Sequence, residues 1–176
     1  MFDNKIIENQ EVLDKVNFRL RFNAISSIFI GIFYIICFIT GFIDEIYYAS
    51  NNLNTIRENW ELTCSVVEIV LSLVLLICFF VHFKHALELK DKIRYNRKIG
   101  VFANAKTCFM ASVFVVCGTS VYFLIILIEL FSAKTILFNS YVIIIPFFIL
   151  FISCFILKFS SEIKKIMGII TGKTPN

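Results

Sequence analysis

The residue best placed to do chemistry in this chain is Glu68, an acid inside the otherwise apolar run LTCSVVEIVLSLVLLICFFVHF of residues 62–83. An ionised carboxylate is costly to bury in hydrocarbon, and acids inside membrane segments usually face a bundle interior or a water-filled cavity. Cys64 and Ser65 lie one helical turn before Glu68 and Ser72 lies one turn after it, so these residues share a helix face. Glu68 is therefore the candidate for an ion or proton site.

Three residues are candidate hydrogen-bond partners of Glu68 because they lie at a similar depth from the outer edges of the other apolar runs. They are Thr40, Tyr122 and Tyr141. No Lys, Arg or His lies at that depth, and without a cation burial favours the neutral, protonated carboxyl. Two interpretations stay open: a protonated acid that fixes helix packing through a tyrosine, or a proton or cation site in a transport path.

The two histidines, His82 and His85, lie three residues apart at the inner end of the same run. Residues at this spacing share a helix face, so both imidazoles could reach one metal ion. Two ligands are too few, and no Cys, Asp or Glu nearby in the sequence completes a set. We therefore predict no metal site and no cofactor, and we expect both histidines to lie at the membrane interface beside Lys84.

Short catalytic motifs are absent from the chain. It contains no HExxH, no GxSxG and no P-loop sequence. Its six cysteines all lie within or at the edge of apolar runs, and no CxxC pair occurs, so a disulfide framework or a thiol oxidoreductase is not indicated. The sequence predicts a protein that is not an enzyme.

The elements that must position these residues are four long apolar runs. The chain has 176 residues, 59% of them hydrophobic and 17% charged, against roughly 45–50% and 25% in soluble domains. About 20 apolar residues in a helix cross a membrane, and four runs reach that length, at about 22–43, 62–83, 107–131 and 136–159. This pattern predicts an all-α polytopic membrane protein, a single four-helix transmembrane bundle over residues 1–176.

The distribution of Lys and Arg predicts the orientation of this bundle. Residues 1–21 carry four, residues 84–106 carry seven and the tail from Lys158 carries four, while the two other connections carry only Arg57 and Lys134. Cytoplasmic segments of membrane proteins are enriched in these residues. Both termini and the helical loop 84–106 are therefore expected in the cytoplasm, and the net charge of +4 does not indicate nucleic-acid binding.

The segments that flank the apolar runs have their own patterns. Residues 1–21 place Ile6, Leu13, Val16 and Leu20 at helical spacing, which predicts either an interfacial helix or a partner-binding helix. The tail from residue 160 is short and basic, and we expect it to lie along the cytoplasmic headgroups.

Small and helix-breaking residues give further expectations. Gly100 and Asn104 offer a break before the third run, and Pro146 predicts a kink in the fourth. Ser27 and Gly31, four residues apart in the first run, have the spacing that lets two helix backbones approach closely.

The sequence favours the function of a non-enzymatic accessory, scaffold or interaction subunit in a plasma, inner or organelle membrane. Its expected partners are the lipid bilayer and a protein partner or a second copy, bound through transmembrane or cytoplasmic helices, and not nucleic acid. The alternative is a small oligomeric transporter or channel with Glu68 in the conduction or proton path. A membrane immunity or stress protein would have the same sequence pattern.

Overall fold

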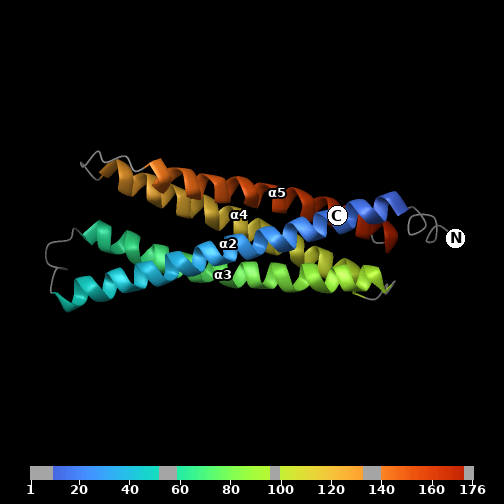
Figure 1. Ribbon diagram of the computed structural model, residues 1–176, viewed down its shortest axis with the longest axis horizontal. Helices are drawn as coiled ribbons and strands as arrows, with labels where there is room; N and C mark the ends of the chain where they lie inside the picture. The colour runs from blue at the N-terminus through green and yellow to red at the C-terminus, as the bar shows by residue number, and fades with distance from the viewer. Residues whose placement is uncertain (1–9, 52–58, 96–99, 133–139, 173–176) are drawn as a thin grey trace.

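The computed structural model describes residues 10–51, 59–95, 100–132 and 140–172. Over these residues the chain forms the helices α2 (Gln10–Ser50), α3 (Asn59–Arg94), α4 (Val101–Ser132) and α5 (Ser140–Ile170), and no strand (Figure 1). The prediction of an all-α chain with four long helices is confirmed.

All four helices are long and apolar enough to cross a membrane. At 1.5 Å per residue, the 41 residues of α2 span about 62 Å and the 31 residues of α5 span about 46 Å, whereas a hydrocarbon core is about 30 Å thick. Large apolar side chains such as Phe80 (68% exposed) and Phe114 (60%) point away from the bundle. Such an apolar exterior is typical of a multi-pass membrane protein.

The helices run alternately up and down. α2 begins, α3 ends, α4 begins and α5 ends at the same end of the bundle, here called the N-terminal end (Figure 1). The other end is the far end. Each helix packs along the next one in the chain, and α2 contacts α5 over a shorter stretch than it contacts α3. The first and last helices therefore close the bundle only in part.

Two apolar cores lie one above the other along the bundle. The terminal core, at the N-terminal end, consists of Val16, Leu20, Ala86, Leu89, Val101, Ala105, Cys108, Ile163 and Met167. The central core consists of Ile30, Tyr34, Leu75, Phe79, Val115, Tyr122, Ile149 and Ile156. All four helices contribute to both cores, so the bundle is packed continuously through its N-terminal half.

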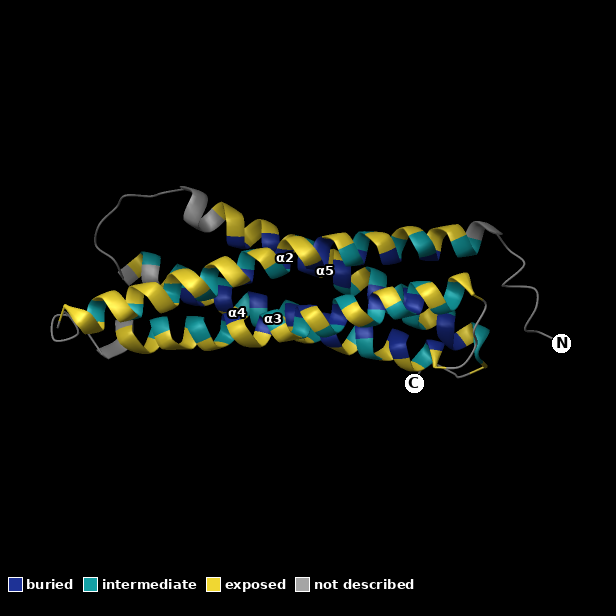
Figure 2. Cartoon of the chain, turned by 60° about the horizontal axis from the view of Figure 1, so that its bottom comes forward, coloured by how far each residue is buried: buried dark blue, intermediate teal, exposed yellow. Residues whose placement is uncertain are grey.

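Packing weakens toward the far end. α2 has no buried residue after Tyr34, and α3 has none among its described side chains before Ser72 (Figure 2). The helices there are exposed on most of their surface. The tightly packed part of the molecule is therefore the end at which the chain begins.

The terminal core corrects two expectations about the chain ends. Residues 10–21 are the first turns of α2, and Val16 and Leu20 are 1% and 2% exposed, so this segment is neither a separate interfacial helix nor free to bind a partner through that apolar face. Ile6 lies outside the described residues. The expectation that residues 160–170 lie along headgroups is also wrong, because they continue α5 and bury Ile163 and Met167.

The connection between α3 and α4 agrees only in part with the expected break. Gly100 has a φ of 75°, a left-handed conformation that glycine adopts without a steric penalty, and α4 begins directly after it. Asn104 does not break the helix. It is 8% exposed within α4, and its Nδ2 donates to Glu88 Oε2 on α3 at 2.9 Å.

A close contact at a glycine occurs at a different position from the one expected, and it is made with a side chain of the neighbouring helix. A Cβ at Gly118 on α4 would lie 2.5 Å from Leu75 Cδ2 on α3, whereas a Cβ at Gly31 would have nothing within 4 Å. The expectation for Gly31 is therefore wrong, and it is Gly118 on α4 whose missing side chain leaves room for Leu75 of α3. Pro146 is buried inside α5, which continues on both sides of it; the kink there remains a prediction.

Candidate functional site

A layer of buried polar residues separates the two apolar cores. It consists of Asn23 and Ser27 on α2, His82 on α3 and Ser160 on α5, which are 1%, 3%, 0% and 1% exposed. Buried polar groups in an apolar interior are costly unless they are hydrogen-bonded. These four residues bond to one another across three helices, and we call them the polar layer.

His82 is the centre of the polar layer. Its Nδ1 lies 2.8 Å from Ser27 Oγ and its Nε2 lies 3.2 Å from Ser160 Oγ. A neutral imidazole has one donor and one acceptor nitrogen, and a serine hydroxyl can donate or accept. Either tautomer can therefore satisfy both ring nitrogens, and the ring connects α2 to α5 through α3.

Asn23 completes the polar layer. Its Nδ2 donates to Ser160 Oγ at 3.1 Å, and its Oδ1 is buried without a hydrogen-bond partner in the part of the chain that the structure describes. The layer thus keeps one acceptor that is not used. Cys108 on α4 closes the fourth side, where its thiol lies 3.8 Å from the His82 carbonyl oxygen.

The helix period explains why these residues are brought together. On α3, His82 lies between the buried residues Phe79 and Ala86 at spacings of three and four, which keep residues on one face of a helix. Ser160 occupies the equivalent position on α5, between Ile156 and Ile163. α3 and α5 each turn an apolar face inward and place one polar side chain at the same level, where α2 contributes Asn23 and Ser27.

The position of His82 contradicts the expectation of an interfacial side chain beside Lys84. Hydropathy places His82 at the end of an apolar run, but α2, α3, α4 and α5 all continue beyond it and bury it. His85, one turn later, is partly exposed; its Nδ1 lies 3.6 Å from Glu88 Oε2. Among the described residues, no group of three or more His, Cys, Asp and Glu side chains could hold a metal ion.

Glu68 lies toward the far end, away from the polar layer. It is half-buried and within electrostatic reach of Cys37 on α2 and Tyr122 on α4, which lie within hydrogen-bond reach of each other. Tyr122 therefore lies near Glu68, and the hydrogen bond expected between them remains a prediction. The predicted polar stripe turns inward, since Ser72 is 0% exposed and Ser65 donates to Glu45 on α2 at 2.5 Å.

The two other expected partners of Glu68 have different positions. Thr40 is exposed, and its hydroxyl donates to its own helix, to Ile36 O at 2.9 Å, so Thr40 does not donate to Glu68. Tyr141 lies in the first turn of α5, but its side chain is outside the described residues. The buried tyrosine that sequence depth did not indicate is Tyr34, whose hydroxyl donates to Thr119 Oγ1 at 3.1 Å.

An ion pair lies beside the polar layer on the N-terminal side. Arg19 on α2 lies 2.6 Å from Glu162 on α5, and its guanidinium lies 5.9 Å from the centre of the Phe159 ring. Both charged side chains are partly exposed. This pair joins α2 to α5.

No protein-family model matches the chain, and neither the curated proteins nor the solved structures contain a significant match to it. Function must therefore be inferred from the arrangement of the chain itself.

Proposed function

We propose that this protein is a non-enzymatic interaction subunit of a membrane, with the N-terminal end of its bundle in the cytoplasm. The observation that supports this proposal is the terminal core. α3 continues 11 residues beyond the apolar run that ends at residue 83, about 16 Å at 1.5 Å per residue. Ala86 and Leu89 in this extension are buried against the other helices, which makes it a packed projection.

The outer surface of this projection carries charges that a partner could bind. Lys84, Asp91 and Arg94 on α3 and Lys106 on α4 are exposed. A packed helical scaffold holds such side chains in fixed relative positions, and complementary charges give an interface specificity and a fast rate of association. The excess of Lys and Arg at this end favours a cytoplasmic location, in a plasma, inner or organelle membrane.

Orientation is tested by labelling single cysteines, placed at the exposed residues Asn51 and Tyr95 in a cysteine-free chain, with a membrane-impermeant maleimide in sealed vesicles. We expect Tyr95→Cys and Asn51→Cys to react from opposite sides. Reaction of both from the same side would contradict the proposed arrangement of the helices.

The interaction itself is tested by purifying the tagged chain from its native membrane in mild detergent. We expect one partner at a constant ratio, and we expect Lys84→Glu combined with Arg94→Glu to release it because the charge of the projection is reversed. Asp44→Lys, an exposed charge change at the far end, is the matched control and should retain the partner. A constant-ratio partner retained by all variants would exclude the projection as the binding surface, and finding none would contradict the proposal.

A second candidate function is proton or cation transport through Glu68, favoured by its position near Cys37 and Tyr122 inside the bundle. Leu75 and Phe79, 1% and 2% exposed, fill the interior between this cluster and the polar layer, so transport would require this core to open. Flux into vesicles that contain wild-type or Glu68→Gln protein tests the candidate. Equal flux at background level in both would exclude it.

A further inference from the structure

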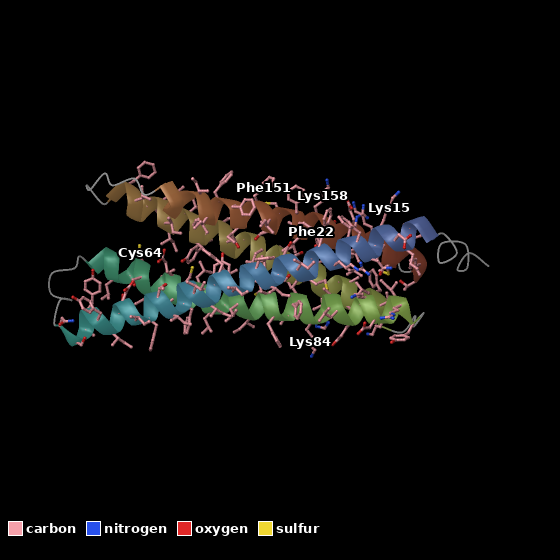
Figure 3. All side chains as sticks on the ribbon, viewed as in Figure 1. Lys15, Phe22, Cys64, Lys84, Phe151 and Lys158 are labelled. Atoms are coloured by element: carbon pink, nitrogen blue, oxygen red, sulfur yellow. The ribbon has the colours of Figure 1, made fainter. Side chains whose placement is uncertain are left out.

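A groove runs between α2 and α5, on the side where the bundle is only partly closed. It encloses about 390 Å³ and is lined by six phenylalanines, Ile152 and Ser26. Phe22 on α2 and Phe151 on α5 are two of these phenylalanines (Figure 3). Small-molecule sites are typically hollows of about 300–1,000 Å³ that are mostly apolar and contain a few polar groups. The groove has this character.

The polar group of the groove is the hydroxyl of Ser26, which is 7% exposed. This hydroxyl makes no hydrogen bond within residues 10–51, 59–95, 100–132 and 140–172. The other buried serines and threonines of these segments all make one; they are Ser27, Ser72, Ser112, Thr119, Ser153 and Ser160. Since a buried polar group without a hydrogen bond is costly, the Ser26 hydroxyl calls for a partner that enters the groove.

The floor of the groove is aromatic. The ring of Phe22 on α2 meets Phe155 and Phe159 on α5 edge to face, with centroids 6.5 Å and 5.1 Å apart, and Phe151 meets Phe155 in the same way at 4.9 Å. Aromatic rings prefer to pair with further rings in stacked or edge-to-face geometry. The floor therefore favours an occupant that contains a planar ring.

The rims of the groove exclude a helix as its occupant. Helices that associate in a membrane do so through small residues, which let their backbones approach. The rims here are bulky instead: Phe18 on α2 and Phe148 and Phe151 on α5 are 65%, 58% and 52% exposed. These side chains keep the backbone of a partner helix, or of a second copy, away from Ser26. A small membrane-soluble molecule can reach it.

The hydroxyl of Ser26 selects among such molecules. A serine hydroxyl has one proton to donate, and an acyl chain offers no acceptor for it. A ligand hydroxyl brings a second proton, and no other polar side chain among the described lining residues can accept that proton. A carbonyl oxygen accepts the Ser26 proton and leaves no donor unpaired, so a carbonyl is the best match.

The position of Ser26 shows that this carbonyl is not the ester of a phospholipid. Phe22 and Phe18 lie four and eight residues before Ser26 on α2, about 6 and 12 Å toward the N-terminal end, and both line the groove. An ester carbonyl at Ser26 would place the attached phosphate against these rings. On α5, which runs antiparallel to α2, Phe151 and Phe148 continue the groove toward the far end.

We propose that the groove binds one membrane-soluble quinone. The ring lies on the aromatic floor, one ring carbonyl accepts the proton of the Ser26 hydroxyl, and the apolar tail follows Phe151 and Phe148 toward the far end. A quinone combines the three features that the groove selects, which are a planar ring, a carbonyl acceptor without a hydroxyl proton, and an uncharged apolar tail.

The test titrates decylubiquinone, a benzoquinone with a short tail, into the protein in micelles of a nonionic detergent. The reporter is Phe151→Trp in a chain in which the single tryptophan is replaced by Trp60→Phe. The control reporter is Phe80→Trp, at an exposed residue on α3. Quinones quench tryptophan fluorescence at short range, so the quenching reports how close the quinone lies to each tryptophan.

We expect saturable quenching at Phe151→Trp and only a linear increase at Phe80→Trp, from quinone dissolved in the micelle. Ser26→Ala removes the hydrogen bond to the ring and should raise the Kd by about two- to tenfold. Ser112→Ala is the matched control, because the hydroxyl of this buried serine donates to its own helix at 2.6 Å, and it should leave the Kd unchanged. As a second measurement, the infrared band of the quinone carbonyl should move to lower wavenumber with the wild-type chain and not with Ser26→Ala.

Three results would overturn the proposal. Linear quenching at both reporters with an unshifted carbonyl band would show that the groove binds no quinone. An unchanged Kd and band in Ser26→Ala would show that the hydroxyl does not hold the ring. Displacement of the quinone by equimolar cholesterol or phosphatidylcholine would show that the groove selects a different lipid. These results are independent of the proposed function, because a cytoplasmic partner would bind the projection whether or not the groove holds a quinone.

Discussion

The polar layer makes a quantitative prediction for His82→Ala. This change removes the hydrogen bonds of the ring to Ser27 and Ser160 and leaves a cavity at a residue that is 0% exposed. Interhelical hydrogen bonds in membrane proteins contribute about 0.6 kcal/mol each and up to about 1.7, so the two bonds account for about 1–3 kcal/mol. With the cavity, whose cost grows with its volume, we expect a loss of about 2–4 kcal/mol.

His85→Ala is the matched control for this prediction. His85 lies on the same helix one turn later, and its ring forms a partly exposed pair with Glu88 at 3.6 Å. Exposed ion pairs contribute about 0–1 kcal/mol. His85→Ala should therefore change the free energy of unfolding by less than about 1 kcal/mol, although both variants remove the same chemical group.

Cys108 offers a local measurement of this effect. Its thiol is 4% exposed and lies 3.8 Å from the His82 carbonyl. The five other cysteines are replaced, and a maleimide then labels Cys108 in mixed micelles that contain increasing amounts of a denaturing detergent. The labelling rate gives the free energy of the local unfolding that exposes the Cys108 thiol. If His82→Ala and His85→Ala differ by less than about 0.5 kcal/mol, the polar layer does not hold the helices together and the reasoning is wrong.

Two further predictions concern packing. Gly118→Ala should be less stable than wild type by about 1–3 kcal/mol, because its Cβ would lie 2.5 Å from Leu75 Cδ2. Gly31→Ala should be neutral or more stable by up to about 1 kcal/mol, because a Cβ there has nothing within 4 Å. Equal thermal stability of the two variants in detergent would contradict the close contact at Gly118. Leu20→Ala, at a 2% exposed residue of the terminal core, should cost about 2–5 kcal/mol, and Ile25→Ala, at a 55% exposed residue, should cost little. A small effect at Leu20 would mean that the start of α2 does not pack on the bundle.

The number and type of the helices could be predicted from the sequence because the physical requirement is simple. A helix that crosses hydrocarbon needs about 20 apolar residues, and four such runs are separated by polar segments. The inward direction of the stripe around Glu68 could be predicted for a related reason, since a polar side chain in an apolar helix is stabilised where it finds a polar partner. The nearness of Glu68 to Tyr122 is expected because the two residues lie at a similar distance from the outer edges of their apolar runs.

Helix boundaries could not be predicted in the same way. The change from charged to apolar residues near Phe22 contains no Pro or Gly to end a helix, and α2 continues through it from Gln10 to Ser50. The same holds near Phe159, where α5 continues to Ile170. Hydropathy reports where a helix leaves lipid, but a helix ends only where its backbone hydrogen bonds end.

The polar layer was missed for the same physical reason. Hydropathy assigns His82 to the interface because it lies at the end of an apolar run, and this assignment assumes that packing stops where hydrophobicity stops. In the structure the helices continue, and Leu89, a full two turns beyond His82, is 0% exposed. A signal for this was available in the spacing of Phe79, His82, Ala86 and Leu89, at three, four and three residues, which is the period of one buried helix face.

This spacing also explains how a polar layer can be stable at this depth. A histidine at the level where the apolar run ends has apolar core on both sides along the bundle, so its ring must find partners within the same layer. The partners are Ser27 on α2 and Ser160 on α5, so both hydrogen bonds of the ring join α3 to another helix. The hydrogen bonds therefore fix the register of α2 and α5 against α3 at the level between the terminal core and the central core.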